Sequence, residues 1–140
     1  MAVHAGAFLR RRELVLDSSL VSRPSELARI LIHEIFHFTW VRLGNTRRRS
    51  FEELVAREIR RGARGELGWS AQLRKNRLQP PDVRDRTRRW REYICESFCD
   101  TGAWRFAGVR AHAEFTLDAV SRARRRRWLR EAGLEDRIPV

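Results

Sequence analysis

The segment from Pro24 to Leu43 limits most strongly what this chain can fold into. As a helix it is apolar on nearly every side, and a helix that is apolar all round is a buried helix. The apolar positions are Leu27, Ile30, Leu31, Ile32, Ile35, Phe36, Phe38, Trp40, Val41 and Leu43. The rest of the chain must therefore pack around this one helix.

Both ends of the segment carry helix signals. Ser22 offers a capping hydroxyl, Pro24 suits the first turn, and Glu26 faces the positive end of the helix dipole. Gly44 supplies a stop just past the last apolar residue. These signals predict a helix over residues 24–43.

The centre of this apolar helix is polar: it carries His33, Glu34 and His37. Burying an ionised carboxylate between two imidazoles is costly unless a cation compensates it. Residues four apart lie about one turn along a helix and roughly 40° around it, so both imidazoles can reach one metal ion. Glu34 can then reach the ion's bound water without ligating the ion, which is the H-E-x-x-H pattern. The alternative is a pair of buried histidines with local hydrogen bonds.

A third ligand is expected from a second buried helix, because a catalytic zinc has three protein ligands and an open fourth position. Glu96 and Asp100 lie four apart in an apolar, aromatic stretch. Glu96 can ligate the ion, and Asp100 can accept a hydrogen bond from a ligating histidine. Cys99 is a competing ligand or a small buried residue, whereas Cys95 is expected to point elsewhere and pack. The alternative for both acids is an ordinary helix surface.

These two motifs together resemble the pattern of the gluzincin zinc peptidases, H-E-x-x-H followed by E-x-x-x-D. The matching residues are His33-Glu34-Ile35-Phe36-His37 and Glu96-Ser97-Phe98-Cys99-Asp100. The resemblance implies a minimal zincin that binds zinc through His33, His37 and Glu96, with Glu34 as general base and Asp100 as the partner of His33. It also implies that the strand near Leu14–Leu16 is the edge that pairs with an extended peptide substrate.

The chemistry expected of such a site is peptide hydrolysis. Zinc lowers the pKa of its bound water and polarises the scissile carbonyl, and Glu34 passes the proton of the water to the leaving amine. The oxyanion needs one further donor. Tyr93 and His112 are the two candidates; their alternatives are a core aromatic residue and a surface histidine near a helix start.

The remaining elements complete a mainly helical chain. Ala7-Phe8-Leu9 and Leu14-Val15-Leu16 predict a short antiparallel hairpin. Further helices are predicted over residues 50–61, over 70–78 with Pro80-Pro81 as the stop, from Asp82 or Asp85 to 106, and over 110–132. We therefore expect an α+β fold, a mainly helical zincin-like core with an N-terminal β-hairpin, forming one domain over residues 1–140.

The charge of the chain favours a different class of protein. With 30 basic against 18 acidic residues the net charge is +12, as in nucleic-acid-binding proteins. However, the only lysine is Lys75, which indicates a compositional bias towards arginine, and arginine runs such as Arg124–Arg127 are usually solvated faces. The alternatives to a peptidase are thus an arginine-rich nucleic-acid-binding protein with a structural metal site, and an inactive zincin fold used as a binding module.

Partners and location follow from the same composition. A peptide or protein substrate is expected, and the positive surface favours an acidic one. Most tryptophans are expected in the core, but Trp128, inside an arginine run, is a candidate partner contact. No stretch approaches the roughly 20 apolar residues that cross a bilayer, and the two cysteines do not form a disulfide framework. We therefore expect a cytoplasmic protein away from membranes; the sequence does not determine its oligomeric state.

Overall fold

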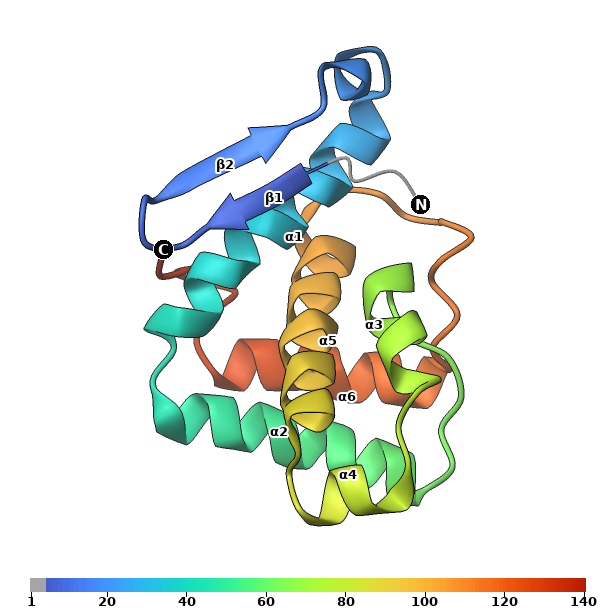
Figure 1. Cartoon of the computed structure of the whole chain (residues 1–140). Helices are drawn as coiled ribbons and strands as arrows, with labels where there is room; N and C mark the ends of the chain where they lie inside the picture. Colours follow the sequence, from blue (N-terminus) through green and yellow to red (C-terminus); the bar gives the residue numbers. More distant parts are fainter. Residues whose placement is uncertain (1–4) are drawn as a thin grey trace.

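The computed structural model describes residues 5–140 and confirms a mainly helical α+β fold with one two-stranded antiparallel sheet (Figure 1). None of the described helices is both long and apolar enough to cross a membrane. The elements in chain order are β1 (Ala5–Phe8), β2 (Glu13–Leu16), a short 3-10 helix η1 (Ser18–Ser22), α1 (Pro24–Arg42), α2 (Asn45–Arg60), α3 (Trp69–Lys75), α4 (Pro80–Arg84), α5 (Arg88–Phe106) and α6 (Ala119–Glu131).

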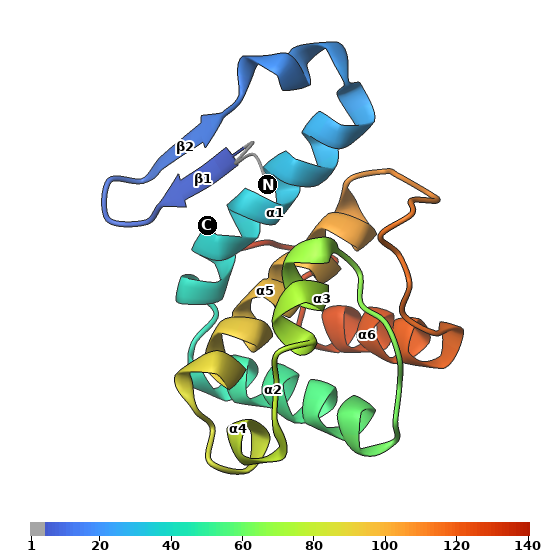
Figure 2. The same ribbon diagram turned by 45° about the vertical axis from the view of Figure 1, so that its right-hand side comes forward.

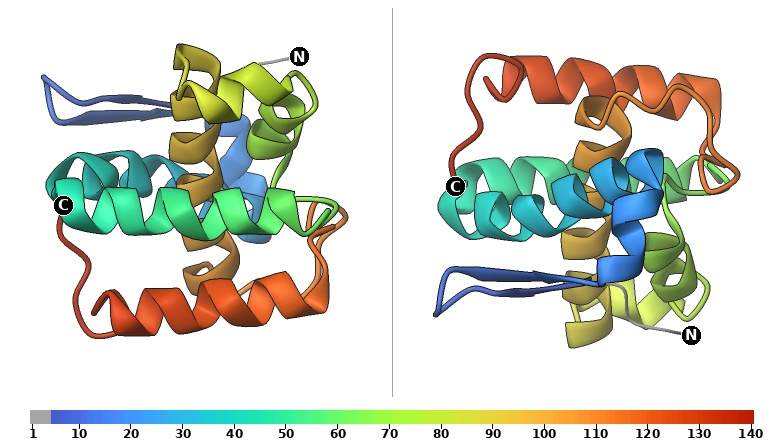
Figure 3. Two further views of the ribbon diagram at one scale, coloured as in Figure 1. Left: turned by 90° about the horizontal axis from the view of Figure 1, so that it is seen from below. Right: turned by 90° about the horizontal axis from the view of Figure 1, so that it is seen from above.

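Helix α5 is the centre of the fold, and α1 packs along it (Figures 1 and 2). The two helices approach closely because α5 carries Gly102, where an added Cβ would lie 2.3 Å from the ring of Phe36. Helices α2 and α6 run across α5, away from the hairpin (Figure 3). Aromatic rings of all four helices meet in the core: Phe36, Phe51, Phe98 and Trp128.

The predicted hairpin is confirmed. Ala5 pairs with Leu16 and Phe8 with Glu13, so β1 and β2 are antiparallel and in register. Arg12 adopts φ 53° in the connecting turn. Strand β1 lies closer to α1 than β2 does (Figure 2).

The second helix begins earlier than predicted. We expected a start at Ser50, yet α2 begins at Asn45. Gly44, with φ 86°, turns the chain directly from α1 into α2. Arg48 then donates hydrogen bonds to two carbonyl groups in the last turn of α1, at 2.9 and 3.0 Å. Because these bonds satisfy the end of α1, no separate loop is needed between the helices.

The prediction that Pro80 and Pro81 end a helix is wrong, because these prolines begin α4. Proline suits the first helical turn, whose N–H groups lack intrahelical partners. The side chain of Asp82 accepts from the backbone N–H of Gln79 at 2.8 Å, which fixes the start of α4. Helix α5 then begins at Arg88 rather than at Asp82 or Asp85.

The last helix is shorter than predicted. We expected it over residues 110–132, but α6 begins at Ala119, after the N-cap Asp118. The preceding chain is held by another segment: the backbone N–H groups of Thr116 and Leu117 both donate to the carbonyl of Glu66, each at 2.9 Å. Because those donors are engaged outside a helix, residues 110–118 form an irregular loop with a turn at Ala113 and Glu114, and His112 lies in this loop.

The run Arg124–Arg127 is not a uniformly solvated face, since Arg125 has 0% exposed surface. Its guanidinium donates to both carboxylate oxygens of Glu58 and of Glu66, at 2.7–2.9 Å. A buried charge of this kind is tolerated only when paired. This ion-pair network joins α2, the loop before α3, and α6.

Trp128 is a core residue, so the expectation of a partner contact is wrong. Only 8% of its surface is exposed, and its ring packs against those of Phe51 and Phe98. Its indole N–H donates to Ser50 Oγ at 3.0 Å. The helix turns this side chain inward while neighbouring arginines stay exposed, which the run alone does not indicate.

Candidate metal centre

Helices α1 and α5 bring the predicted ligands together. The Nε2 atoms of His33 and His37 lie 3.1 and 3.4 Å from Glu96 Oε2. Ligand atoms bound tetrahedrally at zinc distances of 2.0–2.1 Å are separated by roughly 3.3 Å. Both separations from Glu96 Oε2 are close to this value, and the donor atoms all lie within 4.8 Å of one another.

The carboxylate of Glu96 also contains an unsatisfied atom. Its Oε2 is buried and makes no well-aligned hydrogen bond to any residue from 5 to 140, although two imidazoles approach it. A buried polar atom without a partner is costly. A cation between this oxygen and the two Nε2 atoms would satisfy all three, and two histidines with one glutamate form a known catalytic zinc donor set. The residues therefore fit a zinc ion.

Asp100 lies behind His33, as predicted. Its Oδ1 is 2.7 Å from His33 Nδ1, so a proton on Nδ1 is held there and Nε2 is directed towards Glu96. Its Oδ2 accepts from the backbone N–H of Ala71, in the first turn of α3, at 2.9 Å. Gly68 makes room for this carboxylate, because an added Cβ would lie 2.3–2.6 Å from its atoms.

The charges at the site are strongly coupled. Burial lowers the pKa of His37, but its contacts with Cys95 and Glu96 raise the pKa to about 10. Burial opposes protonation of His33 too, yet the carboxylates of Asp100 and Glu96 hold its pKa well above the usual value. Burial raises the pKa of Glu96, but both imidazoles together hold it well below the usual range. The raised pKa values favour protonated imidazoles at His33 and His37 when no metal is bound. A metal ion must displace these protons in order to bind.

Glu34 lies beside the ligands without joining them, as the motif predicts. It lines a pocket of about 510 Å³ together with His33, His37 and Glu96. Burial raises the pKa of Glu34, and neighbouring carboxylates add to the effect. A carboxyl group with a raised pKa is better matched to proton transfer near neutral pH.

The pocket also reaches the hairpin, but through the other strand. Ala5, at the start of β1, lines the pocket, whereas no residue of β2 is among its described lining residues. The expectation that Leu14–Leu16 forms the strand beside the site is therefore wrong. These residues belong to β2, which lies on the far side of β1 from α1.

Tyr93 is not at the site, contrary to the prediction. It is completely buried, and its hydroxyl donates to Glu66 Oε1 at 2.5 Å. Ser97, one turn later on α5, donates to the same oxygen at 3.0 Å. Helix α5 thus directs Glu96 and Asp100 towards α1 and directs Tyr93 and Ser97 towards the Arg125 network.

His112 is held in a separate cluster. Its Nε2 is 2.5 Å from Glu26 Oε1, and its Nδ1 accepts from the backbone N–H of Glu114 at 3.1 Å. Arg29 lies between the same two carboxylates, 3.0 Å from Glu26 and 2.8 Å from Glu114. Glu26, His112 and Glu114 thus form a second group of possible metal donors, with atoms within 4.8 Å of one another, and Arg29 pairs with both of its carboxylates. The structure therefore does not place His112 with the proposed ligands.

Cys99 lies where both of its predicted roles place it, but Cys95 differs from expectation. Cys99 lies with His33, His37 and Glu96 in a group whose donor atoms are all within 4.8 Å of one another. Cys95, expected to point elsewhere, has its Sγ 3.7 Å from His37 Nδ1. Hydrogen bonding to Cys99 and the proximity of His37 lower the pKa of Cys95 to about 6, whereas burial raises the pKa of Cys99 well above its usual value.

Arg74 is a site residue that the sequence did not indicate. Its guanidinium lies 3.6 Å from Glu96 Oε1, the oxygen that faces away from the imidazoles, and it lines the pocket. Its NH1 donates to the carbonyl and hydroxyl oxygens of Ser70, both at 3.0 Å, which fixes its direction. One arginine among so many has no distinguishing signal in the sequence.

Comparisons of the chain with protein-family profiles, curated proteins and solved structures gave no significant match. The geometry and chemistry of the residues described above therefore carry the functional argument.

Proposed function

We propose that this protein is a zinc-dependent metallopeptidase of the gluzincin type, in which His33, His37 and Glu96 hold the zinc ion. The observation that carries the proposal is the spacing of the two Nε2 atoms around Glu96 Oε2, 3.1 and 3.4 Å, with no hydrogen bond to satisfy that oxygen. When bound, zinc supplies Lewis-acid polarisation of a carbonyl and acidification of water.

The protein's own side chains then have separate tasks. Glu34 accepts a proton from water on its carboxylate and delivers it to the nitrogen of the leaving amine. Asp100 keeps the proton of His33 on Nδ1, so that Nε2 stays available as a ligand. Arg74, rather than Tyr93 or His112, stabilises the oxyanion. Its guanidinium lies beside Glu96 and lines the pocket where this negative charge develops.

The pocket favours a peptide or protein substrate. It lies between β1, α1 and α3, and its lining includes exposed apolar surface on Trp69 and Leu73. Arg23 and Arg74 also line it, and both side chains are partly exposed, by 53% and 39%. These positive groups favour acidic residues near the cleaved bond.

A structural metal site is the second candidate, and the position of Cys99 favours it. If the thiolate of Cys99 joined the other three donors, zinc would have four protein ligands and no open position. Substitution with cobalt distinguishes the two sites, since a Co²⁺–thiolate bond gives a charge-transfer absorption band. The peptidase requires that this band be absent, and that Cys99→Ala bind cobalt as the wild type does.

The activity test compares zinc-loaded wild type with Glu34→Gln on a peptide library read by mass spectrometry. Glu53→Gln, which changes an exposed glutamate on α2, is the matched control. We expect cleavage by wild type and control, and a loss of about a hundredfold or more in Glu34→Gln with zinc still bound. Equal cleavage by Glu34→Gln, or a zinc-loaded wild type that cleaves nothing, would refute the peptidase.

A further inference from the structure

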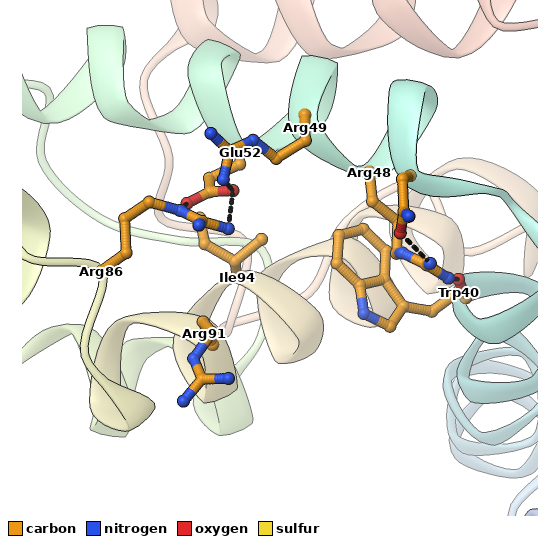
Figure 4. Close-up of a pocket in the computed structure, with 8 residues that line it drawn as sticks. Trp40, Arg48, Arg49, Glu52, Arg86, Arg91 and Ile94 are labelled. Carbon is orange, nitrogen blue, oxygen red and sulfur yellow. Dashed lines mark hydrogen bonds and ion pairs between the residues drawn. The ribbon is translucent and has the colours of Figure 1, made fainter.

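A second pocket, of about 540 Å³, lies where the end of α1, the first turns of α2 and the start of α5 meet (Figure 4). Its volume is within the range of pockets that hold small molecules. It shares no lining residue with the metal pocket. The lining consists of Trp40, Asn45, Arg48, Arg49, Glu52, Arg86, Arg91 and Ile94.

This pocket is strongly positive: it has four arginines and one acidic residue, Glu52. Glu52 is already engaged, since Arg86 donates to its two oxygens at 2.6 and 3.1 Å and the indole N–H of Trp90 donates at 2.8 Å. Arg49 reaches this carboxylate only at 3.9 Å. The backbone N–H of Arg91 donates to the carbonyl of Thr87, but its guanidinium makes no hydrogen bond or ion pair with any residue from 5 to 140. Three positive charges thus remain without an acidic counterpart.

Two of the arginines are fixed in place. Arg86 has a backbone φ of 49°, a conformation that is strained outside glycine, and its guanidinium is held by both oxygens of Glu52. Arg48 is held by two carbonyls at the end of α1 and by Asn45 Oδ1 at 2.6 Å. The other two, Arg49 and Arg91, are exposed. The pocket therefore combines two guanidinium groups fixed in place with two exposed ones, of which Arg49 has a long ion pair with Glu52.

Two of the lining side chains are apolar, those of Trp40 and Ile94. Figure 4 shows Trp40 beside Arg48 at one end and Ile94 near Arg86 at the other. The indole of Trp40 is backed by the ring of Phe98, with centroids 4.9 Å apart, so it is a rigid surface. A partly exposed indole next to guanidinium groups suits a ligand that has both a planar ring and phosphate groups.

We propose that this pocket binds a nucleotide, with the phosphates held by the arginines and the base stacked on Trp40. Guanidinium groups bind phosphate oxygens in a bidentate manner, which point charges cannot do. A nucleotide fits better than a nucleic-acid strand because the four arginines and the indole line a single pocket. This site is independent of the metal centre and of any peptidase activity.

The test is calorimetric titration of metal-free protein with ADP, adenosine, inorganic phosphate and a single-stranded oligonucleotide. The variant is the double substitution Arg49→Gln/Arg91→Gln. Its control is Arg57→Gln/Arg127→Gln, which removes two exposed arginines from α2 and α6 and has the same net charge. We expect ADP to bind wild type and control equally and to bind the variant about tenfold more weakly or worse. Adenosine alone and phosphate alone should bind the wild type no more tightly than ADP binds the variant.

Several results would overturn the proposal. ADP that does not bind would show that the pocket is not a nucleotide site. ADP that loses affinity equally in variant and control would show that only general charge acts. Phosphate that binds as tightly as ADP would remove the role of Trp40. An oligonucleotide that binds more tightly than ADP would indicate a nucleic-acid surface instead.

Discussion

The two oxygens of Asp100 hold different parts of the structure. Oδ1 fixes the imidazole of His33, and Oδ2 accepts from the first turn of α3. Asp100 is only 2% exposed, so neither bond competes with bulk water. A single carboxylate therefore sets both the orientation of a proposed ligand and the position of the helix that carries Arg74.

We expect Asp100→Asn to weaken zinc binding by about 10- to 100-fold, because an amide holds a ligating histidine less well than a carboxylate does. Competition with a chromophoric chelator measures the affinity, and far-ultraviolet circular dichroism checks that the helices remain. Asp136→Asn, at an exposed position, is the control and should bind zinc as the wild type does. Unchanged affinity in Asp100→Asn would mean that Asp100 has no part in the site.

The sequence predicted which residues meet at the metal centre because spacing within one helix determines which side chains share a face. That argument worked for His33 and His37 on α1 and for Glu96 and Asp100 on α5. The expectation for Tyr93 failed because α5 directs its hydroxyl to Glu66, whereas Glu96 faces α1. Contacts from other elements, such as that of Arg74, depend on tertiary packing and leave no local signal.

Among the elements, the long helices were predictable and their ends less so. Apolar periodicity located α1 and α5, but prolines were misinterpreted at the start of α4, and α6 was extended backwards over residues 110–118. Helix α4 begins at a local cap, where the side chain of Asp82 accepts from the N–H of Gln79, whereas the start of α6 depends on contacts between distant parts of the chain. The bonds from Thr116 and Leu117 to the carbonyl of Glu66 are an example.

Gly68→Ala tests how α3 and α5 fit together. The added Cβ would lie 2.3–2.6 Å from the carboxylate of Asp100 and would displace it from His33. We expect a loss of about 1–3 kcal/mol in the free energy of unfolding, as in other overpacked sites, and weaker zinc binding. Chemical denaturation and the chelator competition measure the two effects.

The matched control is Gly62→Ala. Gly62 has φ 75°, so alanine there is strained, but nothing lies within 4 Å of the added Cβ. This variant should lose stability without losing zinc affinity. If Gly68→Ala behaves in the same way, the contact between Gly68 and Asp100 does not support the site.

At the scale of the whole molecule, the buried ion pairs of Arg125 join α2, α6 and the loop before α3. Glu66 also accepts from Tyr93 and Ser97, so it adds α5 to this network. Burial raises the pKa of Glu66, but Arg125, Tyr93 and Lys75 outweigh this effect and lower the pKa from 4.5 to about 2.

A lowered pKa of this kind stabilises the folded state above the unfolded pKa of 4.5, and the contribution is lost as the pH falls towards 2. At neutral pH it corresponds to about 3 kcal/mol. We expect Glu66→Gln to lose stability at pH 7 and to show a flatter decline between pH 5 and pH 2 than the wild type. Urea denaturation across this range measures both. Glu53→Gln should follow the wild type, and a parallel decline in Glu66→Gln would contradict the role of this carboxylate.

The fold shows where some of the arginines behind the net charge of +12 lie. One arginine is buried with two glutamates, two are paired around Glu26 and Glu96, and four gather at the second pocket. These seven arginines therefore act at particular places in the fold. Which arginines turn inward depended on the tertiary fold, so composition alone did not distinguish them.

The central claim is that His33, His37 and Glu96 form a zinc site, and its most direct test is the zinc content of the purified protein after incubation with zinc and removal of the excess. We predict a single zinc ion per chain in wild type and in Glu34→Gln, measured by inductively coupled plasma mass spectrometry, and almost none in the folded double variant His33→Ala/His37→Ala. A folded wild type that retains no zinc, or a double variant that retains as much as the wild type, would contradict the claim.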